Sequence, residues 1–118
     1  MLNNLTNGLS NAFNFSSRAS RGEFICIIST YVLFAFFLAP LLDSFFYASS
    51  KVPPFKALTL MLLTLPVISV SVRRLHDHNL SGKWTLSFLV GGIGFVLLLP
   101  VLLSEGQEEP NRFGEPII

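Results

Sequence analysis

The chain has 118 residues, of which 51% are apolar and 13% are charged, and its mean hydropathy is +0.60. A soluble domain carries roughly a quarter charged residues, so this composition excludes a disordered tail and a nucleic-acid-binding arm. The formal net charge of +1 provides no strong field for an acidic substrate or a polynucleotide. The composition therefore predicts a small membrane protein, and the length allows a single domain over residues 1–118.

The N-terminal segment, residues 1–23, has no Lys or Arg before Arg18, so it lacks the basic start of a secretory signal peptide. Apolar residues at positions 2, 5, 9, 12 and 13 recur at helical spacing, with Asn and Ser between them. This pattern favours an amphipathic helix lying in the membrane interface on the cytoplasmic side. Because its polar face is uncharged, a frayed polar terminus is an equal alternative.

Three long apolar runs follow, at residues 24–42, 55–72 and 84–103. A helix rises about 1.5 Å per residue and the hydrocarbon core is about 30 Å thick, so roughly 20 apolar residues are needed to cross it. The first and third runs meet this requirement without a charge. The middle run needs Phe55 and Lys56 to approach it, so it either crosses or re-enters. The sequence predicts an all-α, polytopic membrane protein with three transmembrane helices.

The Lys and Arg residues near the ends of these runs predict the orientation. Five of them precede the first run or lie in the second connection, whereas three lie in the first connection and the tail. Since the cytoplasmic side carries more Lys and Arg, we expect the N-terminus in the cytoplasm and the polar, acidic tail, residues 104–118, in the periplasm. The predicted location is the inner membrane of a bacterium, with a multi-pass topology.

The densest polar feature follows the second run and reads Arg73-Arg74-Leu75-His76-Asp77-His78. A metal site at its two histidines would require an extended backbone and further ligands, so we expect no metal and no cofactor. A general base at His76 oriented by Asp77 is the catalytic alternative, although no nucleophile with a recognisable partner accompanies it. We expect instead a structural network at the level of the lipid headgroups, which joins the first and second runs. Its predicted members are Arg18, Arg21, Glu23, Arg73, Arg74, His76 and Asp77.

Small residues recur in the third run at Ser87, Gly91 and Gly94, which would share one face of a continuous helix. Small side chains allow another helix backbone to approach closely in lipid. We therefore expect this face to pack against the other spans or against a second copy in a homo-oligomer. A pore-lining or hinge role is the alternative.

Three segments resemble, in order, the motifs of a known family. Residues 15–24, FSSRASRGEF, resemble F-x-G-R-x-x-R-x-E-F-W; residues 73–82, RRLHDHNLSG, resemble R-R-L-H-D-x-x-x-S-G-W; and residues 111–116, NRFGEP, resemble N-R-Y-G-x-x-P. Together they resemble the bacterial inner-membrane family called domain of unknown function 805, over about residues 13–116.

The chain departs from these motifs at Ser17, where the family has glycine, and at Phe113, where it has tyrosine. Ile25 and Lys83 replace tryptophans, which thins the aromatic belt. The resemblance implies a polytopic inner-membrane protein and no established reaction, cofactor or catalytic residue.

Three functions from different classes fit these observations. We expect foremost a non-enzymatic membrane component that binds partner proteins or anionic phospholipid headgroups through a basic cytoplasmic rim, and no nucleic acid. The second is a small oligomeric pore of the holin-like or toxic kind. The third is a membrane enzyme that uses His76 and Asp77.

Overall fold

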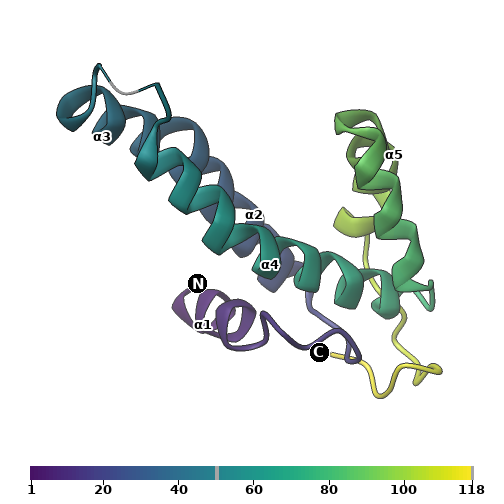
Figure 1. Cartoon of the computed structure of the whole chain (residues 1–118). Helices are drawn as coiled ribbons and strands as arrows, with labels where there is room; N and C mark the ends of the chain where they lie inside the picture. Colours follow the sequence, from purple (N-terminus) through teal and green to yellow (C-terminus); the bar gives the residue numbers. More distant parts are fainter. Residues whose placement is uncertain (50, 118) are drawn as a thin grey trace.

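The computed structural model describes residues 1–49 and 51–117, and 69% of these residues are helical, with no strand among them (Figure 1). The predicted all-α fold class is therefore confirmed. The last residue of the predicted tail, 118, lies outside the described residues. In chain order the elements are α1 (Leu2–Ser10), α2 (Arg21–Leu33), the π-helix η1 (Phe34–Leu38), α3 (Ala39–Phe46), α4 (Pro54–Asp77), the 3₁₀-helix η2 (Gly82–Val90) and α5 (Gly92–Leu103).

The first apolar run forms one continuous helical rod from α2 through η1 to α3, Arg21–Phe46. The rod begins where the Ser20 hydroxyl accepts the backbone N–H of Glu23, which caps the first turn. Its π turn lies directly before Pro40, and there the N–H of Ala39 bonds to Phe34, five residues back. Proline has no N–H and its ring collides with the carbonyl four residues earlier, so a widened turn lets the helix continue.

The helix α4 lies alongside this rod, and the two form a long helical hairpin (Figure 1). The rod has 26 residues and α4 has 24, which correspond to about 39 and 36 Å of helix. Both are long and apolar enough to cross a membrane. Large apolar side chains on both, such as Phe36, Phe37, Met61 and Leu62, are at least 61% exposed. Such a surface is suited to lipid contact.

The third apolar run is not one helix, which corrects the prediction of a continuous span over residues 84–103. It divides into η2 and α5 at Gly91, whose φ of 84° is a conformation that L side chains rarely adopt. The two pieces double back on each other as a short hairpin beside the long one (Figure 1). With 12 residues, α5 reaches only about 18 Å. This piece is too short to cross a bilayer.

Both ends of the short hairpin lie beside the C-terminal end of α4. At its start, Gly82 lies close to Val72, and at its end the carbonyl oxygen of Ser104 accepts a hydrogen bond from Arg74. The tail then continues along the N-terminal segment, where it contacts Arg18 (Figure 1). The tail and the N-terminal segment are therefore in contact, whereas the sequence predicts that they lie on opposite sides of the membrane.

A small apolar core joins these elements at their shared end. Its buried members are Ala19, Phe24, Ile27, Val70, Leu75 and Leu102. The helix α1 packs on α2 beside this core, with Gly8 directly against Ile27. The N-terminal residues are thus helical, as one of the two alternatives predicted, and they are not a frayed terminus.

Candidate functional site

The candidate site is a group of buried charged side chains at this shared end, which we call the arginine clamp: Arg18, Glu23, Arg73, Arg74 and Asp77. Asp77 at the end of α4 is its centre. Nε of Arg18 donates to Asp77 Oδ1 at 2.8 Å, and Nη2 of Arg18 lies 2.6 Å from the same oxygen. Nη1 of Arg74 pairs with Asp77 Oδ2. Two guanidinium groups therefore share one carboxylate, and all three side chains are at most 5% exposed.

The two guanidinium groups that meet at Asp77 use their remaining N–H groups on backbone carbonyls. Arg74 donates to Leu102 at 2.9 Å and to Ala19 at 3.3 Å, and also to Ser104. Arg18 donates to Glu109 at 3.1 Å and to Gly114 at 3.3 Å, and also to Gln107. Because buried charges need hydrogen-bond partners, these carbonyls fix the tail against the N-terminal segment and the end of α4.

A second ion pair joins α4 to the start of α2. Arg73 Nη2 lies 2.6 Å from Glu23 Oε1, and neither side chain is more than 8% exposed. The backbone reinforces this connection, since the N–H of Ala19 donates to the carbonyl of Arg73 at 3.1 Å. Arg21, the remaining predicted basic member, is exposed and takes no part in the ion pairs of the described residues.

His76 is buried beside the clamp but is not paired with Asp77. Its Nδ1 donates to the carbonyl oxygen of Ser17 at 3.1 Å, and its ring stacks on Phe113 with the centroids 3.8 Å apart. Its own backbone carbonyl accepts from Asn111 at 3.0 Å. The carboxylate of Asp77 is occupied by the two arginines, so the described residues contain no His76–Asp77 dyad of the kind that the catalytic alternative requires.

His78 follows the end of α4 and lies 3.4 Å from the hydroxyl of Ser104. Burial lowers the pKa of its imidazole, and the nearby positive charge of Arg74 lowers that pKa further. The neutral form of His78 is therefore the one that this environment favours.

The described residues contain no group of three or more His, Cys, Asp or Glu side chains arranged to hold a metal ion.

The small residues of the third run serve a different contact from the predicted one. Ser87 is in η2, Gly91 is at the break and Gly94 is in α5, so they do not share one helix face. A Cβ at Gly94 would overlap the backbone carbonyl of Ser87. Gly94 therefore allows the two arms of the short hairpin to approach closely. The continuous stripe of small residues, on which the alternative of a pore-lining role was based, is not formed.

Sequence analysis missed one buried carboxylate at the opposite end of the long hairpin. Asp43 is 7% exposed, and its two oxygens accept the backbone N–H groups of Phe55 and Lys56 at 2.8 and 2.9 Å. It thus caps the first turn of α4 from across the connection. The available signal was the start of α4 at Pro53-Pro54, which supplies no side-chain cap of its own.

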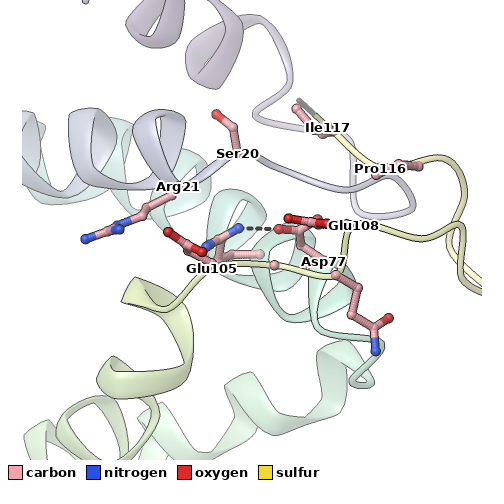
Figure 2. A pocket seen from close by; sticks show the side chains of 10 residues that line it. Ser20, Arg21, Asp77, Glu105, Glu108, Pro116 and Ile117 are labelled. Carbon is pink, nitrogen blue, oxygen red and sulfur yellow. Dashed lines mark hydrogen bonds and ion pairs between the residues drawn. The ribbon is translucent and has the colours of Figure 1, made fainter.

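An open polar hollow of about 680 Å³ lies over the Arg74–Asp77 pair. Figure 2 shows Glu105 and Glu108 of the tail near Asp77, and the side chain of Arg21 extending away from them. The tail backbone packs closely against Asp77 at Gly106, where a Cβ would overlap the Asp77 carboxylate. A hydrogen bond from Arg74 also connects the tail to the end of α4, and charged tail side chains are exposed on the outer surface.

Comparison with known proteins assigns the chain to a family. The family described as "Protein of unknown function (DUF805)" matches residues 12–115, so the chain belongs to this family. It is 41% identical over 64 residues to the inner membrane protein YhaI of Escherichia coli strain K12, a match that spans 54% of each chain. It is 32% identical over 108 residues to YhaH of the same strain, covering 90% of this chain and 88% of YhaH.

The chain thus spans about half the length of YhaI in that match and most of YhaH. No solved structure matches it significantly. The names of these relatives and the two long apolar helices identify the chain as a bacterial inner-membrane protein.

Proposed function

We propose that this chain crosses the inner membrane twice, through the Arg21–Phe46 rod and through α4, and that its short hairpin enters and leaves from the cytoplasmic side. Both described ends of the chain are then cytoplasmic. The observation that supports this proposal is the set of hydrogen bonds from Arg18 to the tail carbonyls, which favours a tail and an N-terminal segment on one side.

The distribution of basic residues supports this orientation. With the tail inside, the cytoplasmic side carries six Lys and Arg residues and the opposite side carries only Lys51 and Lys56. The arrangement with three spans gave five against three. Since cytoplasmic segments are enriched in Lys and Arg, the contrast favours two spans with a re-entrant hairpin.

We further propose that the protein acts without catalysis, as a membrane component that presents the tail surface to a partner protein. Arg18 and Arg74 are buried and donate to internal partners, so they are not part of an exposed basic rim. The exposed charges at this end are instead three basic residues, Arg21, Lys83 and Arg112, and four acidic ones, Glu105, Glu108, Glu109 and Glu115. The basic ones suit anionic headgroups, and the acidic tail suits a basic surface on the partner.

A second copy of the chain would satisfy one open requirement of the short hairpin. No atom that a Cβ could meet lies within 4 Å at Gly91 or Gly92, and the first turn of α5 has no side-chain cap. In hydrocarbon these N–H groups need cover, which supports a homo-oligomer that contacts itself through the hairpin tips. Crosslinking in native-like lipid should give dimers through a cysteine at position 92, and monomers alone would contradict this.

Reporter fusions test the orientation. A fluorescent protein after Ile118 should fluoresce and an alkaline phosphatase at the same place should be inactive, because both would be cytoplasmic. The matched fusion in the connection after Tyr47 should give the opposite pair of results. Active phosphatase after Ile118 would refute the two-span arrangement.

In-cell photocrosslinking tests the partner. A photoreactive residue in place of Glu108 should form a discrete adduct, and the same residue in place of Phe45, which is exposed at the other end, should not give that adduct. Neutralising Glu105 and Glu109 together should reduce the adduct at position 108. Identical adducts at both positions, or no adduct at 108, would contradict the proposal.

A further inference from the structure

A second hollow, of about 670 Å³, is lined by Glu23 and Arg73 and shares Ser20 and Ile117 with the one in Figure 2. Its walls come from the polar face of α1, from the start of α2, from the end of α4 and from the tail near Glu115. The hollow is therefore built from four separate parts of the chain around one ion pair.

This ion pair is the least satisfied part of the clamp. Arg18 and Arg74 donate to several carbonyls, whereas Arg73 Nε and Nη2 and Glu23 Oε1 are buried without a hydrogen-bond partner among the described residues. The 2.6 Å approach of Nη2 to Oε1 brings the charges together without the alignment of a hydrogen bond. Arg73 is only 2% exposed. Buried donors and acceptors of this kind are normally paired, so the ion pair beside the hollow keeps unused hydrogen-bonding capacity.

The uncharged polar face of α1 forms one wall of the hollow. Asn4, Asn7 and Asn11 line the hollow, at the i, i+3 and i+7 positions that share a helix face. Each amide can both donate and accept. Neither Asn4 nor Asn7 has a side-chain hydrogen bond in the part of the chain that the structure describes. The face that lacks Lys and Arg is thus a lining of neutral hydrogen-bonding groups.

The charges around the hollow select the chemistry of the ligand. Its charged lining residues are two cations, Arg18 and Arg73, and two carboxylates, Glu23 and Glu115. The lining therefore carries no net formal charge. A purely anionic group would leave the two carboxylates without a cation, whereas a group with both a phosphate and an ammonium would complement charges of both signs.

We propose that this hollow binds a phosphoethanolamine group, as the headgroup of a membrane phospholipid. The phosphate oxygens accept from Arg73 and from the asparagine amides, and the ammonium donates to Glu23 and Glu115. The helix α1 packs on α2 between Gly22 and Ile27, where the first apolar run begins, so the hollow lies at the depth of the headgroups. This goes beyond the proposed function, since it concerns a lipid site and not a partner protein.

Native mass spectrometry of the purified full chain in detergent micelles tests the proposal. Phosphatidylethanolamine, phosphatidylcholine and phosphatidylglycerol with identical acyl chains are titrated separately. We expect phosphatidylethanolamine to bind at least about tenfold more tightly than the other two, because the first rival lacks ammonium N–H donors and the second lacks the cation. Equal retention of the three lipids would overturn the proposal.

Variants locate the binding. The double change Asn4→Ala with Asn7→Ala leaves the ion pair intact and should weaken phosphatidylethanolamine binding about tenfold. Asn3→Ala removes an exposed amide from the same helix outside the hollow and should leave binding unchanged. Glu115→Gln should reduce the preference for phosphatidylethanolamine over phosphatidylglycerol. Unchanged binding in the double variant would overturn the proposal, and equal melting temperatures establish that the variants are folded.

Soluble O-phosphoethanolamine distinguishes the two sources of the same group. If millimolar amounts do not displace the lipid, the ligand is the membrane headgroup, as proposed. If the soluble compound binds as tightly as the lipid, the chemistry of the hollow holds and its assignment to a lipid is overturned. The hollow rests on the proposed position of the tail beside α1, but these results do not depend on the partner protein, so the lipid site and the partner surface can fail separately.

Discussion

Replacing Asp77 by asparagine should be among the most destabilising single changes in this chain. The substitution keeps the shape of the side chain and removes the negative charge that two buried guanidinium groups share. Removing one partner of a buried ion pair costs about 3–5 kcal/mol. Because Arg18 and Arg74 retain their backbone carbonyl partners, we expect the lower end, about 3 kcal/mol in the free energy of unfolding.

The measurement is reversible unfolding of the purified protein in mixed micelles, as sodium dodecyl sulfate is titrated in and helix content is followed by circular dichroism. Glu108→Gln is the matched control, since it removes an exposed tail carboxylate that has no ion pair in the described residues. That variant should stay within about 0.5 kcal/mol of the parent.

A double-mutant cycle separates the pair from the site. Arg18→Met, Asp77→Asn and their combination should give a coupling energy of about 0.5–3 kcal/mol, because the two side chains are in direct contact. An Asp77→Asn variant within 0.5 kcal/mol of the parent, as estimated for a surface change, would refute the view that the clamp holds the two hairpins together.

Three further outcomes are expected. Gly94→Ala should destabilise the protein by about 1–3 kcal/mol in the same micelle assay, since its Cβ would overlap the carbonyl of Ser87. The matched control Gly92→Ala places a Cβ where no atom lies within 4 Å, so it should be neutral or slightly stabilising. Asp43→Ala should cost about 1 kcal/mol, because the cap of α4 is lost, and an unchanged midpoint would contradict the capping role. Burial holds the pKa of His78 below its ordinary value of 6.5, so the unfolded chain binds protons more readily and stability should decline as the pH falls below about 6.5. A series of melting temperatures against pH should show this decline, and His78→Gln should reduce it. An identical pH dependence in that variant would exclude His78 as a contributor.

The two long helices were predictable because lipid imposes a simple requirement. Nineteen uncharged residues from Phe24 to Leu42 must be helical to satisfy their own backbone in hydrocarbon. Their boundaries were less predictable. The rod extends to Arg21 at one end because Ser20 caps it, and to Phe46 at the other because a π turn accommodates Pro40.

The third run was wrongly predicted because mean hydropathy does not depend on backbone conformation. Residues 84–103 are as apolar as a spanning helix, yet Gly91 adopts a positive φ and reverses the chain. The Gly91-Gly92 pair was the local signal for a turn. Interpreting these glycines as a packing stripe required the continuous helix that the pair itself interrupts.

The side chains of the arginine clamp were predictable from the sequence, but their backbone partners in the tail were not. Opposite charges near two span ends indicated that Arg18, Glu23, Arg73, Arg74 and Asp77 could meet, and the structure brings these five together. The tail was missed because its contribution is made by carbonyl oxygens of residues such as Gln107 and Glu109. Every residue carries a carbonyl, so the sequence holds no pattern that would identify these acceptors.

The reach of Arg18 across the chain has a consequence for biogenesis. Its acceptor at Gln107 is synthesised 89 residues later, which at roughly 5–20 residues per second is a delay of about 4–18 seconds. During translation the rod and α4 are already available for insertion while this guanidinium still waits for its acceptors. Final assembly must therefore follow elongation through the tail, and a nascent chain stalled before residue 107 would leave Arg18 without this acceptor.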